Sequence, residues 1–334
     1  MRGASNHRSC IIVGAGISGL LAASTLQSEN WDVTVLDKGR SVGGRMATRR
    51  VGEGNFDYGA QFFTLRDERF AGLVEGWLRA GVAVEWTRGF SDAEGQPNVD
   101  GHPRYRGAEG MASIPKYVSR DLDVRTGERA VRVDSDDGGW EVVCESGLRV
   151  VGHALALAAP VPQALDLAAS GDYALPDGAG RWLETISYDP CLALMVLLDG
   201  PTGVPEPGGM QIKGEPLDWI SDNRRKGISS APALTVQAGP EWSRSHFEDD
   251  EAEVTETMLS LAGDRLGVDL ATVETSLTRW RHSWVSVPHP EPCFVASDDP
   301  PLLFCGDAFG QTRVEGAALS GLAAADHLLG RDAR

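Results

Sequence analysis

The strongest constraint on the fold of this chain is a glycine-rich motif that directly follows its first apolar segment. Ser9–Val13 has the β-branched character of a short strand, and Gly14-Ala15-Gly16-Ile17-Ser18-Gly19 comes next. The following residues have helical spacing, and a second apolar strand, Trp31–Leu36, ends at Asp37. Strand, GxGxxG, helix, strand and acid, in this order, predict a Rossmann-type βαβ unit that binds a dinucleotide.

Each position of the motif has a physical role in holding a pyrophosphate. Gly14 permits the tight turn, Gly16 leaves room for the phosphates because it has no Cβ, and Gly19 lets the helix pack closely on the strand. The helix begins near Ile17 and Ser18, where free N–H groups and the positive end of the helix dipole face the phosphates. A glycine-rich turn without a ligand is the alternative, and the strand, helix and acid around the motif argue against it.

The segment after the second strand adds a further signature. Asp37 stands where a carboxylate accepts hydrogen bonds from a ribose diol, and Lys38 follows it. Gly43-Gly44-Arg45-Met46 is not needed for NAD, and it resembles the second signature of the FAD flavoproteins of glutathione-reductase type. Arg45 would bring positive charge to the pyrophosphate, with a solvated surface arginine as the alternative. These residues predict FAD as the cofactor.

The C-terminal segment repeats the pattern of a buried strand followed by a glycine and an acid. Leu302–Cys305 leads into Gly306-Asp307, and a helix of small residues starts at about Arg313–Ala317. We expect Asp307 to accept a hydrogen bond from the ribityl chain, with a plain turn as the alternative. Gly316 and Ala317 would let the flavin ring approach the helix start, where the helix dipole stabilises negative charge.

The length of the chain and the distribution of its prolines indicate two domains. At 334 residues it is long for a single core, and between Thr185 and Trp284 prolines separate short alternating strands around one helix, about Asp249–Leu266. We expect an α/β fold in which a Rossmann-type FAD-binding domain is joined to a substrate-binding domain of mostly antiparallel β-sheet. The FAD-binding domain would comprise 1–75, 105–165 and 290–334, and the substrate-binding domain 76–104 and 166–289.

The net charge and the cysteines disfavour several classes of binding partner and of structural site. With 31 basic and 48 acidic residues the net charge is −17, which disfavours nucleic acid and anionic membrane surfaces. Five widely spaced cysteines are typical of reduced thiols, not of a disulfide framework or a zinc site. The polar start, Met1–Cys10, does not resemble a signal peptide, and no apolar run is long enough to span a membrane. We expect a cytoplasmic protein without a metal.

Several motifs together resemble the renalase family. The specific ones are Gly-Arg-Met at Gly44–Met46, Gly-Ala-Gln-Phe at Gly59–Phe62 and Trp-Arg-His at Trp280–His282, and the likeness runs from the first strand to the last helix. The resemblance implies a two-domain fold like that of p-hydroxybenzoate hydroxylase, with non-covalent FAD. It also implies oxidation of the 2- and 6-dihydro isomers of NAD(P), with dioxygen reduced to hydrogen peroxide.

The resemblance also assigns site residues. Gln61 and Phe62 would lie beside the flavin ring, while Gln237, Trp280 and His282 would line the other face of the substrate site. Either glutamine would orient the nicotinamide carboxamide; for Trp280 a core position, and for His282 a satisfied polar role, are the alternatives. The full predicted cofactor set is Gly14, Gly16, Ile17, Ser18, Gly19, Asp37, Lys38, Gly44, Arg45, Met46, Ala60, Gln61, Phe62, Val131, Gly306, Asp307, Glu315, Gly316 and Ala317.

Two other function classes stay open at this point. One is an amine oxidase or a desaturase of isoprenoid or tetrapyrrole rings, and the other is a flavin-binding protein without turnover. Amine oxidases of related fold usually hold a lysine near the flavin, and Lys213 is the lysine that a strand of the substrate domain would carry inward. The oligomeric state stays open as well.

Overall fold

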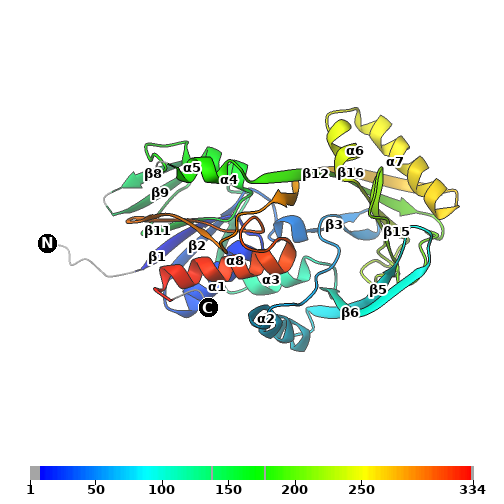
Figure 1. The fold of residues 1–334 in the computed structure, drawn as a ribbon, viewed down its shortest axis with the longest axis horizontal. Coiled ribbons are helices and arrows are strands. Elements are labelled where there is room, and N and C mark those ends of the chain that lie inside the picture. The colour runs from blue at the N-terminus through cyan, green and yellow to red at the C-terminus, as the bar shows by residue number, and fades with distance from the viewer. Residues whose placement is uncertain (1–7, 137, 177, 332–334) are drawn as a thin grey trace. The chain divides into compact units, whose positions relative to one another are not determined.

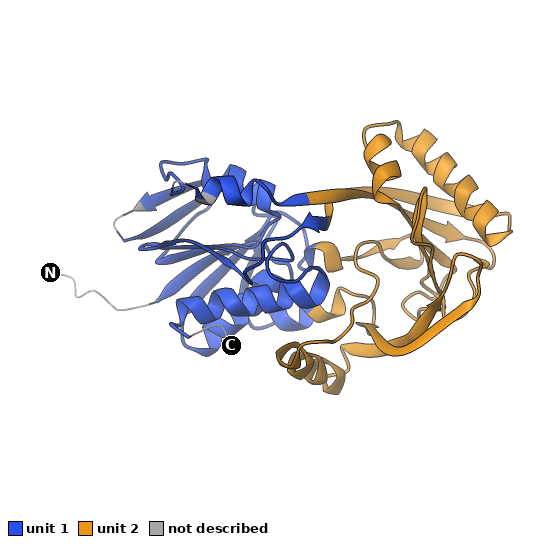
Figure 2. Cartoon of the chain, viewed as in Figure 1, with its two compact units in different colours: residues 1–44, 115–187, 285–334 blue, residues 45–114, 188–284 orange. Residues whose placement is uncertain are grey.

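The computed structural model describes residues 8–136, 138–176 and 178–331. The chain forms two compact units, each built from segments far apart in the sequence (Figure 2). Unit 1 comprises residues 1–44, 115–187 and 285–334, and unit 2 comprises residues 45–114 and 188–284. The predicted domains have other bounds, since they assign 45–75 and 105–114 to the FAD-binding domain and 166–187 to the substrate-binding domain, and their functional assignment stays a prediction.

A largely parallel sheet forms the centre of unit 1 (Figure 1). Its strands are β1 (Ser9–Val13), β2 (Asp32–Asp37), β7 (Asp123–Thr126), β11 (Ala154–Leu157), β17 (Phe294–Asp298) and β18 (Pro301–Phe304). They lie in the order β17-β18-β11-β1-β2-β7, and only the pair β17–β18 is antiparallel. Continuous apolar runs such as β11, in which all four residues are buried, are typical of strands covered on both faces.

Two long helices of unit 1, α1 (Ile17–Ser28) and α8 (Arg313–Leu328), pack against each other (Figure 1). An added Cβ at Gly321 of α8 would overlap the carbonyl oxygen of Ser18 in α1, so this glycine permits the close approach of the two helices. Three shorter helices are α3 (Ser113–Ser119), α4 (Val161–Ala168) and α5 (Ala179–Leu183). Unit 1 also contains a three-stranded sheet of β8 (Ala130–Asp136), β9 (Gly139–Cys144) and β10 (Arg149–Gly152).

A seven-stranded sheet forms the centre of unit 2. Its strands are β5 (Ala83–Ser91), β6 (Pro97–Gly107), β12 (Ser187–Leu198), β13 (Gly209–Gln211), β14 (Leu217–Asp222), β15 (Ala233–Ala238) and β16 (Thr272–Val287). Their order is β16-β12-β15-β14-β13-β5-β6. The pairs β12–β15, β15–β14, β14–β13 and β5–β6 are antiparallel, as the sequence pattern predicts for this part of the chain.

One face of this sheet packs under helix α7 (Glu251–Leu266) (Figure 1). The Asp250 side chain caps the helix by accepting hydrogen bonds from the backbone of Ala252 and Glu253, and Gly267 ends it with a φ of 65°. The core between them contains Leu192, Leu194, Val196, Ile220, Leu234, Val236, Val254, Met258 and Ala262. Unit 2 also contains the hairpin β3 (Thr48–Val51) and β4 (Gly54–Asp57), and the helices α2 (Glu68–Arg79) and α6 (Pro240–Ser245).

Prolines explain two helices that the sequence pattern does not predict. Pro160 and Pro162 follow a buried strand, and in the sequence they indicate the end of regular structure, yet α4 begins between them. Pro240 is likewise the first residue of α6. A proline is tolerated in the first turn of a helix because its missing N–H would have no partner there. The strand β6 is also missed, since its polar residues lack the alternation of a half-buried strand.

The structure bears on two expectations, that the cysteines are reduced thiols and that no segment spans a membrane. All five cysteines are unpaired, and burial raises the pKa of the Cys305 thiol to about 12, which keeps it protonated and unreactive. Among the described residues no helix is long and apolar enough to cross a lipid bilayer. Residues 1–7, on which the signal-peptide argument rests, lie outside the described residues.

We predict that Gly321→Ala destabilises the protein by about 1–3 kcal/mol, because the new methyl group forces α1 and α8 apart. Gly72→Ala is the matched control: Gly72 lies in α2, and an added Cβ there meets no atom within 4 Å. That control should gain about 0.5–1 kcal/mol from the better helix propensity of alanine. Urea denaturation of both variants measures the difference, and equal stability of the two would contradict the packing argument.

Candidate active site

The turn between β1 and α1 has the geometry that a dinucleotide requires. Gly14 has a φ of 117°, and an added Cβ there would lie 3.0 Å from the backbone of Ala158. An added Cβ at Gly19 would overlap the carbonyl oxygen of Gly14, so Gly19 permits the helix to approach the turn. At Gly16 a Cβ would meet no protein atom within 4 Å, so the space in front of this residue is open. Gly16 is also the N-cap of α1 and supplies no side-chain cap, which leaves the first N–H groups available to an anion.

The carboxylate of Asp37 holds two loops around this turn. Its Oδ2 accepts a hydrogen bond from the backbone N–H of Ala15 at 2.6 Å, and its Oδ1 accepts one from Gly39 at 2.6 Å. The neighbouring Gly43 donates to the carbonyl oxygen of Ala15 at 2.8 Å. Each carboxylate oxygen keeps a further lone pair, so the expected bond to a ribose hydroxyl is compatible with this structural role. The Lys38 ammonium donates to the side-chain oxygen of Gln163 at 2.6 Å.

The loop after β18 is tightly built. The backbone N–H of Gly306 donates to Ser320 Oγ at 2.9 Å, and both Asp307 and Glu315 are buried. An added Cβ at Gly316 would overlap the carbonyl oxygen of Gln311, so the loop itself requires this glycine, apart from any flavin. Arg313, the first residue of α8, has a φ of 73°, a conformation rare for side-chain-bearing residues that concentrates at functional sites.

The predicted site residues divide between the two units. Those in unit 1 are Gly14, Gly16, Ile17, Ser18, Gly19, Asp37, Lys38, Gly44, Val131, Gly306, Asp307, Glu315, Gly316 and Ala317. Those in unit 2 are Arg45, Met46, Ala60, Gln61, Phe62, Gln237, Trp280 and His282. Val131 is 43% exposed on β8, and its role in cofactor binding stays a prediction.

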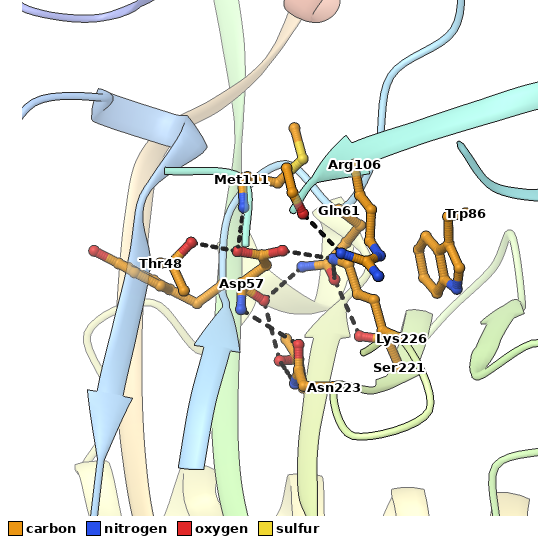
Figure 3. Close-up of polar contacts among 12 residues, drawn as sticks. Thr48, Asp57, Gln61, Trp86, Arg106, Met111, Ser221, Asn223 and Lys226 are labelled. Carbon is orange, nitrogen blue, oxygen red and sulfur yellow. Dashed lines mark hydrogen bonds and ion pairs between the residues drawn. The ribbon is translucent and has the colours of Figure 1, made fainter. Parts of the chain in front are cut away.

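In unit 2 the predicted residues gather around the loop from Asp57 to Phe62, at the end of β4. The loop begins at a buried ion pair: Lys226 Nζ lies 2.7 Å from Asp57 Oδ2, and both side chains are fully buried (Figure 3). Asp57 Oδ1 accepts from Thr48 Oγ1 at 2.5 Å and from the backbone of Met111 at 2.8 Å. The Asp57 backbone N–H donates to Asn223 Oδ1 at 3.3 Å. Asp57 therefore joins its own strand to three other segments of unit 2, those of Thr48, Met111 and Asn223–Lys226.

Two further groups surround the ion pair (Figure 3). The Lys226 ammonium lies 4.9 Å from the ring centre of Trp86, a cation–π contact. Arg106 donates to the carbonyl oxygens of its own turn, residues 107 and 108, at 2.8 Å each. Burial lowers the pKa of both Lys226 and Arg106, while the Asp57 carboxylate acts in the opposite direction.

The side-chain amide of Gln61 is fixed at both ends. Its Nε2 donates to the carbonyl oxygens of Asp57 at 2.7 Å and Gly59 at 3.2 Å. Its Oε1 accepts from Ser221 Oγ at 3.0 Å and lies 3.4 Å from Lys226 Nζ (Figure 3). Because protein groups occupy both ends of this amide, Gln61 serves the loop and is poorly available to a substrate.

Phe62 packs into an aromatic cluster. Its ring centre lies 4.8 Å from that of Phe90 and 5.7 Å from that of Trp219. Trp86 completes the cluster, 4.9 Å from Phe90 and 6.2 Å from Trp219. Such rings fix one another at preferred angles, so the position of Phe62 is well determined.

Gln237 and Trp280 hold the middle of the same loop. Gln237 Nε2 donates to the carbonyl oxygen of Gly59 at 2.8 Å, and Trp280 Nε1 donates to that of Tyr58 at 2.9 Å. The Trp280 ring also stacks on the Tyr58 ring, with centres 5.2 Å apart. Thr235, two residues before Gln237 on β15, donates to the Asp57 carbonyl oxygen at 3.0 Å.

Arg45 and His282 meet at a neighbouring point of unit 2. Arg45 Nη1 donates to the backbone carbonyl of His282 at 3.2 Å, and its guanidinium lies 6.0 Å from the ring centre of Tyr188. The His282 ring approaches the same tyrosine edge-on, at 5.4 Å. The Arg45 carbonyl accepts from Ala60 at 2.8 Å, and an added Cβ at Gly59 would overlap this carbonyl oxygen. The two sequence signatures are thus physically joined, because Gly59 lets the Arg45 backbone approach.

The lysine that lies inside unit 2 is not Lys213. Lys213 follows β13, has a φ of 54° and is exposed, whereas the buried lysine is Lys226. Lys226 belongs to the run Asn223-Arg224-Arg225-Lys226, which in the sequence resembles a solvated basic turn. The sequence pattern assigns no role to Asp57, which stands just before the Gly-Ala-Gln-Phe motif. No local signal marks either residue, since each acquires its role through the other.

Comparison with known proteins decides the family. Residues 93–329 match the model of the flavin containing amine oxidoreductase family, and residues 12–76 match that of an NAD(P)-binding Rossmann-like domain. The chain belongs to the flavin containing amine oxidoreductase family. FAD is therefore its cofactor, and the predicted α/β fold with a Rossmann-type FAD-binding domain is confirmed. The open space at Gly16 and the uncapped start of α1 fit the pyrophosphate of this cofactor.

Relatives within and around the family differ in what their names say they do. An L-amino acid dehydrogenase of Synechocystis sp. is 38% identical over 71 residues, which are 21% of this chain and 15% of the dehydrogenase. A hydroxyneurosporene desaturase of Rubrivivax gelatinosus is 39% identical over 82 residues, which are 24% of this chain and 14% of the desaturase. The chain thus matches about a seventh of the length of these relatives.

Two solved structures are similar over nearly the whole chain. A protein of Exiguobacterium sp. 255-15 assigned as a protoporphyrinogen oxidase superposes with a TM-score of 0.74 at 13% identity. A putrescine oxidase bound to putrescine also gives 0.74, at 16% identity. Each comparison covers 97% of this chain and 99% of the other. At these identities the likeness shows the fold alone.

We predict that Asp57→Asn destabilises the protein by about 3–5 kcal/mol, because it leaves the Lys226 ammonium buried without a counter-charge. Adding Lys226→Met should restore most of the loss, since neutral groups of similar size replace both charges. Urea denaturation followed by tryptophan fluorescence measures both variants. The control is Glu75→Gln, which breaks the exposed Arg79–Glu75 pair and should change little. A double variant no more stable than Asp57→Asn alone would contradict the ion-pair argument.

A second prediction concerns Gly16→Val. The valine side chain would fill the space left for the pyrophosphate, so the variant should purify without FAD. Because an added Cβ meets no protein atom within 4 Å, its melting temperature should equal that of wild-type apoprotein. The absorbance ratio of flavin to protein and thermal denaturation measure the two effects. Full FAD occupancy in the variant would show that the pyrophosphate lies elsewhere.

Proposed function

We propose that this protein is an FAD-dependent oxidase of dihydronicotinamides, acting on the 2- and 6-dihydro isomers of NAD(P). The reduced ring loses a hydride and becomes an aromatic pyridinium cation. When bound, FAD accepts the hydride and passes two electrons to dioxygen, which takes up the hydride-derived proton and one proton from solvent to form hydrogen peroxide. The products are NAD(P)⁺ and hydrogen peroxide, so atoms and electrons balance.

One observation carries this choice within the family. The partly exposed or exposed side chains around the loop from Asp57 to Phe62 are amides and aromatic rings, including Gln237, Trp280 and Phe62, together with the cationic Arg45 and Arg49, while the charges of Asp57 and Lys226 neutralise each other inside. A dihydropyridine needs no base, because hydride loss is driven by aromatisation. An amine arrives as an ammonium ion and must lose a proton first. A surface of amides and rings bordered by arginines repels an ammonium ion and therefore suits the dihydronicotinamide better.

The remaining predicted residues receive roles under this proposal. Gly14, Gly16 and Gly19 admit the pyrophosphate, Arg45 neutralises part of its charge, and Asp37 accepts from the adenylate ribose. Asp307 accepts from the ribityl chain. In the same proposal the flavin ring is bounded by Ala60, Gln61, Phe62, Glu315, Gly316 and Ala317, with Met46, Gly44 and Val131 along the rest of the cofactor.

The rate of flavin reduction tests the proposal. Under nitrogen, 2- or 6-dihydro-NAD(P) should bleach the flavin on the order of a hundredfold faster than ordinary 4-dihydro NADH, because the ring carbon that loses the hydride is misplaced in the common isomer. Stopped-flow absorbance measures these rates, and the monoamines benzylamine and phenethylamine, together with the diamine putrescine, serve as competing substrates. If an amine bleaches the flavin faster than every dihydronicotinamide isomer, the protein is an amine oxidase and the proposal fails.

A further inference from the structure

We propose that Gln237, with Gln211, forms the surface that selects the carboxamide of the substrate ring, and that Gln61 does not contact it. This inference rests on the proposed function and names the residues that would give it specificity. Gln211 has no role in the sequence-based prediction, which left Gln61 and Gln237 as equal candidates. The argument begins with the register of the unit 2 sheet.

The pairing of the strands places four residues in one row across the sheet. Ala193 of β12 lies opposite Gln237 of β15, Gln237 opposite Trp219 of β14, and Trp219 opposite Gln211 of β13. Directly opposed residues of antiparallel strands point to the same face. Adjacent residues such as Met210 belong to the core under α7, so the row points away from α7. That second face is the one that holds the loop from Asp57 to Phe62, as the bond from Gln237 to Gly59 shows.

Burial separates this row from the next one. The next row on the same face consists of Met195, Thr235, Ser221 and Gly209, and it is buried. Its Thr235 and Ser221 are hydrogen-bonded to the loop from Asp57 to Phe62. In the first row Gln237 and Gln211 are partly exposed. Within these two rows, the polar side chains that a ligand can reach are therefore the two amides, which flank the buried Trp219.

The orientation of Gln237 follows from its partner. A backbone carbonyl only accepts hydrogen bonds, so the NH₂ group of Gln237 must face Gly59, at 2.8 Å. Its Oε1 has no hydrogen-bond partner among the residues that the structure describes. In Gln61 both ends of the amide are occupied, by carbonyl oxygens on one side and by Ser221 and Lys226 on the other. Gln237 thus offers an oriented acceptor, and Gln61 offers none.

Gln211 supplies the complementary donor. Within the described part of the chain its side-chain amide makes no hydrogen bond, and neither does the buried indole N–H of Trp219 between the two glutamines. A buried N–H without a hydrogen-bond partner is rare in native proteins, so the Trp219 indole points to a ligand on this face. Neighbouring strands are about 4.8 Å apart, so Gln211 and Gln237, two strands apart, can reach opposite sides of one small polar group. A primary carboxamide, with two N–H donors and one carbonyl acceptor, fits this pair.

A substrate analogue tests the inference without any mutation. In the dihydro isomers of 3-acetylpyridine adenine dinucleotide, a methyl group replaces the NH₂ of the carboxamide and removes its donors. Wild-type enzyme should be reduced at least about tenfold more efficiently by the carboxamide isomers, because the analogue leaves Gln237 Oε1 unpaired. Equal efficiencies would overturn the inference while leaving the proposed function intact.

Variants then show which residue causes the preference for the carboxamide over the acetyl analogue. Gln237→Met, which has similar size but no amide, should reduce the preference to within about twofold, and Gln211→Met should reduce it partly. Gln96→Met, a glutamine in the turn between β5 and β6, is the matched control and should keep the wild-type ratio. FAD content and melting temperature report whether each variant is folded. An unchanged ratio in folded Gln237→Met overturns the inference. If no dihydronicotinamide reduces wild-type enzyme, the proposed function fails first and this inference fails with it.

Discussion

Unit 2 depends on one buried ion pair, that between Asp57 and Lys226. Both side chains are fully buried, so each charge is tolerable only because the other lies 2.7 Å away and hydrogen bonds from Thr48 and Met111 satisfy Asp57 Oδ1. The pair ties the end of β4 to the segment after β14 and to the turn that contains Met111. Its main consequence is positional: the loop that follows Asp57 is fixed at its first residue, and Gln61 closes back on it.

The two faces of the unit 2 sheet have different roles: one packs against α7, and the other holds the loop from Asp57 to Phe62. The face under α7 is apolar and needs only good packing, as residues such as Leu194, Val236 and Met258 show. The other face carries Thr235, Ser221 and Gln237, whose polar groups would be costly there without partners. The loop from Asp57 to Phe62 supplies most of those partners through its backbone. The alternation of a β-strand is what permits both demands in one sheet.

Local requirements explain which features could be predicted from the sequence. Gly14 and Gly19 are each required because a side chain would not fit at that position of one short turn, and Gly16 because a side chain would fill the space left for the pyrophosphate, so their spacing predicts the Rossmann unit and FAD. Several strands of unit 2 were predictable for the same reason, since β12 carries a continuous apolar run and β14 and β15 are short apolar segments between turns. The Asp57–Lys226 pair was not, because its members come from distant segments and a basic run normally faces solvent. The register that aligns Gln237 with Gln211 likewise arises only when three separate strands pair.

The most direct test of this account is a crystal structure of the protein with FAD and NAD⁺ bound. The account predicts that the loop from Asp57 to Phe62 borders the flavin, with the Asp57–Lys226 pair intact beneath it. It also predicts that the nicotinamide carboxamide N–H lies within hydrogen-bond distance of Gln237 Oε1, with Gln61 still bonded to Asp57 and Ser221. A nicotinamide bound away from Gln237, or a Gln61 side chain turned out of its bonds to contact the ring, would contradict it.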